Sequence, residues 1–272
     1  MFNSTLLANT EVQSADRFSL QNGKMLRAVL GPTSGMTEFL ARKGAMVAYQ
    51  GGVNFDAEYR GWGDHVARRI TGEGLNLMRA SGTGTVFLAN QAQDVHVLDL
   101  TGDGLTIDGN NVLAFERSLR WDIVRIDSQV AIAGAGGYNI ELTGTGKVAV
   151  TTNGHPLVMR VTPQNYHFAD ADAVIAWSSG LQVSMQAAVT SSSVWRPRGS
   201  TGESWQMQFT GDGLVVVQPS ELLPPYSALA GAGLSERFGL GSAGFAGNTM
   251  SGGHNPSGGA NPSGGGNPFG RR

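Results

Sequence analysis

Three stretches of the chain carry the same glycine corner: residues 80–88 read ASGTGTVFL, residues 142–150 read LTGTGKVAV, and residues 209–217 read FTGDGLVVV. In each stretch two glycines flank one residue, and apolar residues follow them. Glycine adopts positive φ without a Cβ clash, so an extended chain can turn sharply at such a corner. The three stretches therefore predict strands that bend at glycine.

The first two corners lie 62 residues apart, and the same offset aligns 112–115 with 174–177 and Leu119 with Leu181. Two separate blocks that share one offset indicate an internal repeat, which covers about 80–123 and 142–185. We therefore expect two structurally similar halves. Each half is predicted to be a β-meander, and the halves are predicted to stack on a common core.

The remaining sequence between 15 and 222 also favours strands. Apolar and polar residues alternate at 119–123, 138–142 and 205–210, which places the apolar side chains on one face of a pleat. About a dozen such segments are separated by Gly, Asn or Asp, a pattern typical of an all-β sandwich or barrel-like fold. One short helix is predicted over 65–70, with Asp64 as its N-cap and Gly72 as its stop.

Composition sets the domain limits. The 272 residues include 40 Gly, 40% are hydrophobic and 15% are charged, so the chain can build a core over most of its length. Periodicity ends after Pro224 and Pro225, and Asn-Pro recurs at 255, 261 and 267. We predict an N-terminal arm at 1–14, a β domain at 15–222 and a Gly/Pro/Asn/Ser-rich flexible tail at 223–272.

Cysteine and charge content exclude several functional classes. The chain has no Cys, so disulfides, thiolate metal sites and thiol nucleophiles are ruled out. Its formal net charge of -2 provides no general attraction for nucleic acid, which is therefore an unexpected partner. No signal peptide and no apolar run of about 20 residues is found, so we expect a cytoplasmic protein without a transmembrane segment.

The glycine-rich segments do not match nucleotide-binding motifs. Residues 134–137 precede a strand-like segment rather than a helix, which argues against a dinucleotide fingerprint. In 144–147, which reads GTGK, Val148 occupies the position where a phosphate loop needs Ser or Thr. Asp103 and Asp108 have no calcium-loop spacing and are interpreted as turn residues. No cofactor is predicted.

The side chains that could catalyse a reaction are also poorly arranged. None of the five His residues lies in a metal-ligand pattern, and Asp94 with His96 is interpreted as a polar strand face rather than a dyad. The serines at 178–179 and 191–193 lack a nucleophile elbow. The sequence therefore predicts no catalytic residue, no metal ligand and no enzyme activity.

Arginine is the main basic residue, with 16 Arg against 3 Lys. Arg117, Arg120 and Arg125 surround Trp121, and Arg196 and Arg198 follow Trp195. Such groups can stack on bases or bind a carboxylate. Our preferred interpretation is that these arginines lie on the solvent face of strands and pair with Asp122, Asp127 or Glu116.

Several ordered motifs over residues 17–221 resemble the altered inheritance of mitochondria 24 family, a former domain of unknown function. They are 42–50 (RKGAMVAYQ), 72–78 (GEGLNLM), 82–89 (GTGTVFLA), 94–105 (DVHVLDLTGDGL), 111–115 (NVLAF), 121–123 (WDI) and 213–220 (GLVVVQPS). The resemblance implies a fold like that of the tryptophan RNA-binding attenuation protein, with antiparallel double sheets in two similar halves. It also implies a homotrimer, and it transfers no catalytic residue.

These observations lead to three functional hypotheses. The preferred one is a non-enzymatic, oligomeric scaffold or binding module of unknown ligand, because open sheet edges need a partner and closed symmetric assembly supplies one. Contact with the surface of a membrane or with a larger assembly stays open. The alternatives are single-stranded RNA binding, which rests on fold analogy alone, and a cryptic metal-dependent enzyme. The Arg-rich, Lys-poor composition suggests a bacterial source.

Overall fold

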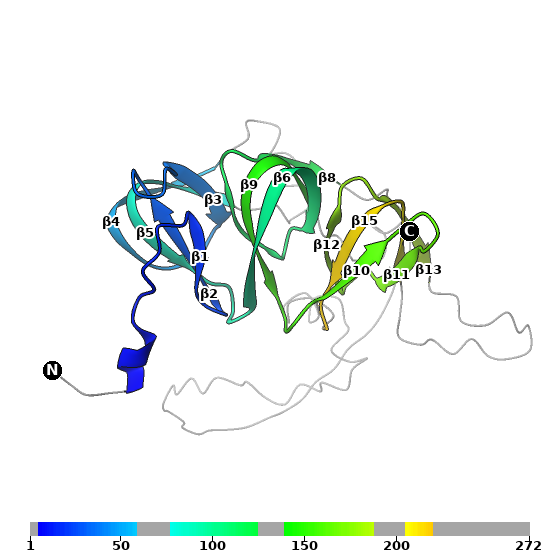
Figure 1. The fold of residues 1–272 in the computed structure, drawn as a ribbon, viewed down its shortest axis with the longest axis horizontal. Helices are drawn as coiled ribbons and strands as arrows, with labels where there is room; N and C mark the ends of the chain where they lie inside the picture. Colours follow the sequence, from blue (N-terminus) through cyan, green and yellow to red (C-terminus); the bar gives the residue numbers. More distant parts are fainter. Residues whose placement is uncertain (1–4, 59–76, 125–138, 188–204, 220–272) are drawn as a thin grey trace, which may run out of the picture. The chain divides into compact units, whose positions relative to one another are not determined.

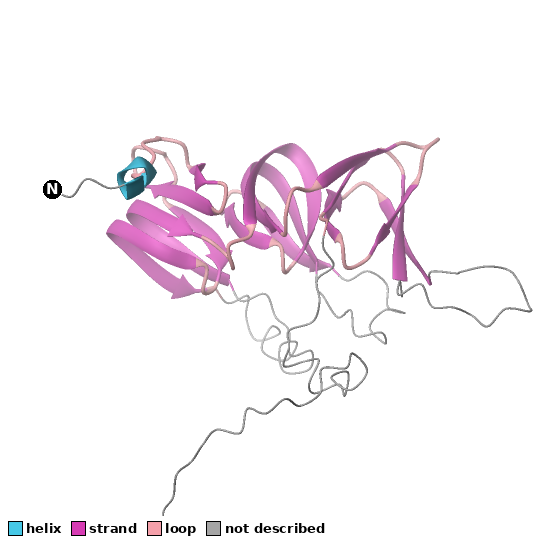
Figure 2. Ribbon diagram, turned by 90° about the horizontal axis from the view of Figure 1, so that it is seen from below, coloured by secondary structure: helices cyan, strands magenta, loops and turns pink. Residues whose placement is uncertain are grey.

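A computed structural model of the chain describes residues 5–58, 77–124, 139–187 and 205–219, which all lie in one compact unit, Met1–Leu223. These residues form antiparallel strands and one short 3-10 helix, η1 (Thr5–Asn9), so the all-β prediction is confirmed (Figure 1, Figure 2). The helix predicted over 65–70 and the tail at 223–272 lie outside the described residues. The strands are β1 (Phe18–Asn22), β2 (Met25–Leu30), β3 (Glu38–Arg42), β4 (Met46–Ala57), β5 (Leu77–Leu88), β6 (Asp94–Asp108), β7 (Val112–Glu116), β8 (Arg120–Val124), β9 (Asn139–Thr152), β10 (Leu157–Val161), β11 (His167–Asp170), β12 (Val174–Ser178), β13 (Gln182–Ala187), β14 (Trp205–Thr210) and β15 (Gly213–Val217).

The strands form three repeats of one design. Each repeat is centred on a long path, which is β5 in the first repeat, β9 in the second, and β14 followed by β15 in the third. One side of this path pairs with β2 and β3 in the first repeat, with β6 in the second, and with β10 and β11 in the third. The other side pairs with β4 in the first repeat, with β7 and β8 in the second, and with β12 and β13 in the third. The structure thus extends the two predicted halves to three repeats.

The 62-residue correspondence holds in space. Strands β5 and β9, β7 and β12, and β8 and β13 each start 62 residues apart. Strands β7 and β12 also share a bulge with the start of β4, because the pairing register shifts between Met46 and Ala48, between Val112 and Ala114, and between Val174 and Ala176. The first half of β4 is therefore the counterpart of β7 and β12.

The glycine corners bend the three central paths in the same way. The first glycine of each corner, Gly82, Gly144 or Gly211, has φ of 117°, 112° or 118°. A Cβ on the second glycine would collide with the neighbouring strand or turn: at Gly84 it would lie 2.0 Å from the Gln50 carbonyl oxygen, and at Gly213 2.8 Å from Ser178 Cβ. Glycine is needed at these corners for both backbone conformation and close approach.

Consecutive repeats are joined by one strand pairing used twice. Strand β3 of the first repeat pairs with β7 of the second, with Leu40 opposite Phe115. The second half of β6 pairs with β12 of the third repeat in the same register, with Thr106 opposite Trp177. The chain is therefore a row in which each repeat offers one strand to the next.

Each of the three repeats has its own apolar cluster. The clusters of the first two repeats also contain residues of the next repeat along the chain. Leu113 and Ala114 of the second repeat enter the first cluster, and Ile175 and Ala176 of the third repeat enter the second cluster. The buried members of the third cluster in the described ranges all come from the third repeat: Val161, Val174, Trp177, Leu181, Met207, Phe209 and Val215.

Candidate functional site

The polar pair weighed in the sequence, Asp94 and His96, lies on β6 with each side chain bound elsewhere. The Asp94 carboxylate forms an ion pair with Lys24 Nζ at 2.7 Å, and the hydrogen bond that Lys24 donates lowers the pKa of Asp94. His96 Nε2 lies 3.0 Å from Thr152 Oγ1, and burial lowers the pKa of the His96 imidazole. Two different partners, Lys24 and Thr152, therefore hold these two side chains.

Of the two predicted turn residues, Asp103 lies instead inside β6, where the pairing with β9 shifts register, whereas Asp108 and two of the serines have local partners. Asp108 Oδ1 accepts a hydrogen bond from the Asn110 backbone N–H at 2.7 Å, as predicted for a turn residue. Ser178 Oγ accepts from the Leu214 backbone N–H at 3.0 Å, and Ser179 Oγ lies 3.1 Å from Thr106 Oγ1. The serines at 191–193 and the glycines at 134–137 lie outside the described residues.

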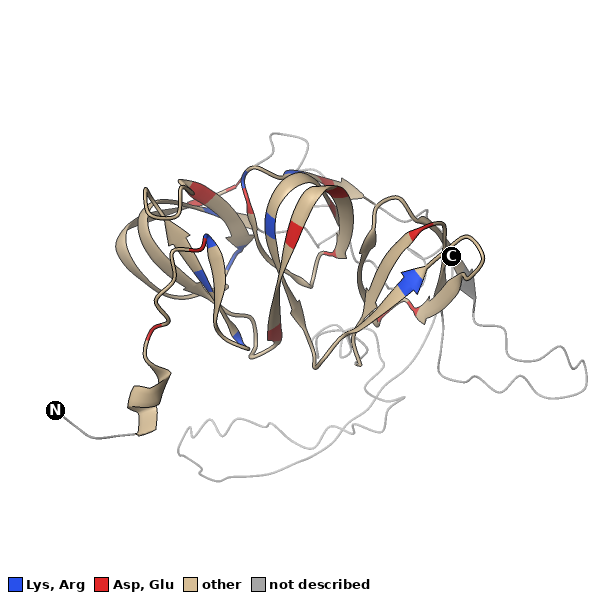
Figure 3. Ribbon diagram, viewed as in Figure 1, with Lys and Arg blue, Asp and Glu red and all other residues tan. Residues whose placement is uncertain are grey.

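Basic side chains are interspersed with acidic ones over the described strands (Figure 3). Arg117 pairs with Glu58 at 3.1 Å and with Glu38 at 3.6 Å, so its partners are acidic side chains, as expected, but other ones than those the sequence suggested. Arg125, Arg196 and Arg198 lie outside the described residues. Within the described ranges no group of three His, Asp or Glu side chains could hold a metal ion. In the same part of the chain no helix is long and apolar enough to cross a membrane.

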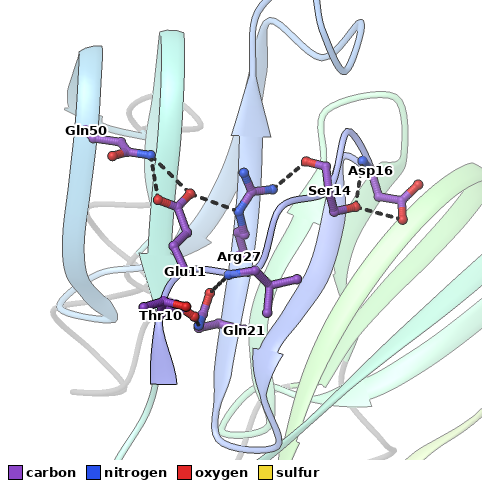
Figure 4. A network of polar contacts seen from close by, with 8 residues as sticks. Thr10, Glu11, Ser14, Asp16, Gln21, Arg27 and Gln50 are labelled. Carbon is purple, nitrogen blue, oxygen red and sulfur yellow. Dashed lines mark hydrogen bonds and ion pairs between the residues drawn. The ribbon is translucent and has the colours of Figure 1, made fainter. Parts of the chain in front are cut away.

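A shallow groove of about 570 Å³ lies between the N-terminal arm and the first repeat. Its polar groups form one network, in which Arg27 Nε donates to Glu11 Oε1 at 3.3 Å and Gln50 Nε2 donates to both Glu11 carboxylate oxygens at 3.0 and 3.1 Å (Figure 4). The buried Arg27 guanidinium also donates to the Ser14 carbonyl at 2.7 Å. The network fixes the arm across β2 and β4 and uses the charged groups of the groove for that purpose.

Two strands at opposite ends of the row of repeats keep an open edge. Residues 46–50 of β4 pair only with β5 among the described strands, although their counterparts β7 and β12 are paired on both sides. Residues 167–170 of β11 pair only with β14 in the same set, although their counterparts β3 and the end of β6 are also paired on both sides. We call these segments the β4 edge (46–50) and the β11 edge (167–170).

Both edges expose apolar side chains whose counterparts are buried. Tyr49 is 50% exposed, whereas the residues at its position in the next two repeats, Phe115 and Trp177, are 0% and 5% exposed. Val47 is 56% exposed at the position filled by the buried Leu113 and Ile175. An exposed strand edge with apolar side chains is a ready template for another strand.

The β11 edge has the complementary property. Phe168 is 45% exposed at the position filled by the buried Leu40 and Thr106 in the first two repeats. Its ring packs edge-to-face on that of Tyr166, with centroids 5.7 Å apart. Within the described part of the chain, the β4 edge and the β11 edge are thus the two strand types that pair between repeats, each without its partner.

The comparisons with known proteins identify the family. A family model described as Mitochondrial biogenesis AIM24 matches residues 18–220. The chain belongs to the AIM24 family. The resemblance found in the sequence is thereby confirmed, and the family match spans all three repeats of this AIM24 chain.

The fold of this AIM24 chain has a solved relative. It is similar to a Streptococcus pyogenes protein of known crystal structure, with 18% sequence identity, a TM-score of 0.58, and coverage of 81% of this chain and 97% of the other. At that identity the likeness establishes the fold alone. A search of curated proteins finds no match.

Sequence reasoning missed the two edges as a candidate site. The sequence shows Val47 and Tyr49 as apolar residues of an ordinary strand, and nothing near them differs in type from 113–115 or 175–177. The signal that could have found them is the alignment of 46–50 with 112–116, whose offset is 66 rather than 62 residues. That match reveals a first repeat and shows that β4, unlike β7 and β12, has no partner strand from a preceding repeat among the described residues.

Proposed function

We propose that the protein is a non-enzymatic, oligomeric scaffold or binding module. One observation carries the proposal: side chains at the β4 edge and the β11 edge stay exposed at positions that the same chain buries elsewhere. Exposed apolar groups on unpaired strands favour association, since pairing satisfies backbone groups and removes apolar surface from water. Association of copies covers both edges.

The polar groups of the described residues support the same proposal. The charged side chains of the groove hold the N-terminal arm, and Asp94, His96 and Arg117 are bound to neighbours in the fold. These contacts give the described part of the chain a structural use for residues that could otherwise act in chemistry.

The test is the molar mass in solution, measured by light scattering behind size-exclusion chromatography from about 1 to 100 μM. We expect a mass that is a multiple of the single chain across this range. A mass equal to one chain at every concentration would contradict the proposal. A trimeric state, a cytoplasmic location and a peripheral contact with a membrane stay predictions from the sequence.

Single-stranded RNA binding is the alternative function. RNA binding requires basic groups that are free to contact phosphates. Arg117, close to Trp121 in the sequence, forms ion pairs with Glu38 and Glu58 instead. We therefore expect no salt-sensitive shift of labelled single-stranded RNA in a mobility assay. Such a shift at micromolar protein would rank RNA binding above the scaffold.

A further inference from the structure

The pairing between repeats follows one rule, which is used twice inside the chain. In the first use Phe39, Leu40 and Ala41 face Glu116, Phe115 and Ala114. In the second, Leu105, Thr106 and Ile107 face Ser178, Trp177 and Ala176. The two antiparallel pairings have the same register, since each residue of one set has its counterpart at the same position in the other.

Applied a third time, the rule places His167, Phe168 and Ala169 opposite Gln50, Tyr49 and Ala48. The first three residues belong to the last repeat and the other three to the first repeat. We propose that β11 of one copy pairs with β4 of a second copy in this antiparallel register, so that copies join head to tail. This proposal rests on the proposed function and names the surface through which the assembly forms.

The side chains at this junction supply what each edge lacks. Phe115 is buried in a cluster that includes Leu40 and Leu77 of the preceding repeat. Tyr49 has its own partner Phe55, with ring centroids 5.2 Å apart, in the same arrangement as Phe115 and Trp121 at 6.2 Å. It lacks only the residue from a preceding repeat, and Phe168 of a neighbouring copy provides an aromatic ring at that position.

The third apolar cluster provides the second argument. The first two clusters take an apolar pair from the following repeat, Leu113 with Ala114 and Ile175 with Ala176, whereas among the described residues the third cluster has none from beyond its own repeat. In the proposed register Val47 and Ala48 of the second copy occupy this place. Both are exposed in the single chain, although all four counterparts are at most 1% exposed.

A second copy is favoured over another protein because the two edges complement each other. Each edge exposes apolar side chains at positions that are buried in the other repeats. The chain itself contains two examples of the complete pairing, β3 with β7 and the end of β6 with β12. A contact between two different surfaces of identical chains is heterologous, so it repeats from copy to copy and forms a ring where the rotation between copies closes, or a filament where it does not. Head-to-tail pairing therefore leaves neither edge open in a closed assembly.

The experiment uses the absence of Cys from the chain, so that engineered thiols are the only ones present. Full-length Ala48→Cys and Ala169→Cys variants are mixed in equal amounts, oxidised mildly and run on a non-reducing gel. We expect a disulfide-linked dimer in the mixture only, and a ladder of covalent multimers from the Ala48→Cys/Ala169→Cys double variant. Residues directly opposite in an antiparallel pair have Cβ atoms close enough for a disulfide.

Two matched controls define the register. Ala41→Cys/Ala114→Cys occupies the same pair of positions within one chain and should cross-link internally without forming dimers. Ala48→Cys mixed with Asp170→Cys places one thiol on the other face of β11, because successive side chains of this regularly paired strand alternate between faces, and should give at least tenfold less dimer.

The outcomes separate the inference from the function on which it rests. Oligomers by light scattering without the 48–169 cross-link would overturn the head-to-tail register and leave the scaffold proposal standing. A cross-linked dimer of Ala48→Cys alone would overturn it in favour of symmetric β4–β4 pairing. A single-chain mass at all concentrations, with no cross-link, would overturn both proposals.

Discussion

The first and middle repeats share one design but differ in how much of it is covered. Phe115 of the middle repeat is fully buried, whereas Tyr49 at the same position of the first repeat is half exposed. Both rings pack edge-to-face on an aromatic residue of their own repeat. The difference therefore comes from the preceding repeat, which places Leu40 beside Phe115, whereas no strand in the described part of the chain holds that place beside Tyr49.

This comparison indicates that one repeat does not complete its own core. The middle repeat is stabilised from both sides, and the two end repeats each expose the side of the contact that a neighbour would cover. A fold made of such units gains stability from interfaces between neighbours as well as from each unit. The ends of the row are consequently the places where association adds most.

Substitution of the two aromatic residues separates the covered from the uncovered repeat. Phe115→Ala should lower the free energy of unfolding by about 4 kcal/mol, because it opens a cavity in a closed core. Tyr49→Ala should lower it by about 1 kcal/mol or less in the dissociated chain. Urea denaturation at low protein concentration measures both values, and equal losses would mean that the first repeat is as well covered as the second.

The corner glycines of the same two repeats should differ as well. A Cβ at Gly82 would lie 2.2 Å from the Gly52 carbonyl oxygen, whereas a Cβ at Gly144 meets nothing closer than 3.8 Å. Both residues have positive φ, so both alanine variants carry conformational strain. We expect Gly82→Ala to cost about 3 kcal/mol and Gly144→Ala about 1 to 2 kcal/mol by thermal unfolding. The reverse order would contradict the close packing of β4 on β5.

Asp108, the last residue of β6 in the middle repeat, should make stability depend on pH. Burial raises the pKa of its carboxyl group from 3.8 to about 6. Because the folded state then holds the proton more tightly than the unfolded state, this group's contribution to stability falls between about pH 4 and pH 6 and stays low above pH 6.

The Asp108→Asn variant should remove that pH dependence and gain about 3 kcal/mol at pH 7 relative to the parent chain. Asp170→Asn, at the matching position of the third repeat, is the control for the substitution itself. Unfolding curves measured from pH 4 to pH 7 test this expectation. A parent chain whose stability does not fall over this range would show that Asp108 is better hydrated than its contacts indicate.

Lysine at the β11 edge should have the smallest effect on the folding of the single chain and a large effect on assembly. Phe168→Lys should change the free energy of unfolding by less than about 0.5 kcal/mol, since the side chain is already exposed. It should nevertheless shift the mass measured by light scattering toward one chain. Leu214→Lys is the matched control, because this residue is 46% exposed on a strand that is paired on both sides.

The strands and their corners could be predicted from the sequence because they depend on local features. Alternation and paired glycines are enough to place β5, β9 and β15, and their φ values follow from the same glycines. The predicted 62-residue offset is real, but it matches β5 with β9, from the first and second repeats, and β7 with β12, from the second and third. Two halves were therefore expected where three repeats occur.

The first repeat stayed hidden because it is built from differently divided strands. Strand β4 runs without a break through Gly51 and Gly52, where the second repeat has a turn at 117–119 between β7 and β8. The open edges could not be predicted either. Whether Tyr49 is covered depends on a strand far away in sequence, and the residue type is the same kind as at the buried positions.

Hydrogen exchange at two protein concentrations tests the head-to-tail account most directly. Backbone amides of residues 46–50 and 167–170 should exchange more slowly at about 100 μM than at about 1 μM, because strand pairing between copies protects them. Amides of β7 (112–116), already paired on both sides within the chain, should exchange at the same rate at both concentrations. Exchange at 46–50 and 167–170 that does not change with concentration would contradict the account.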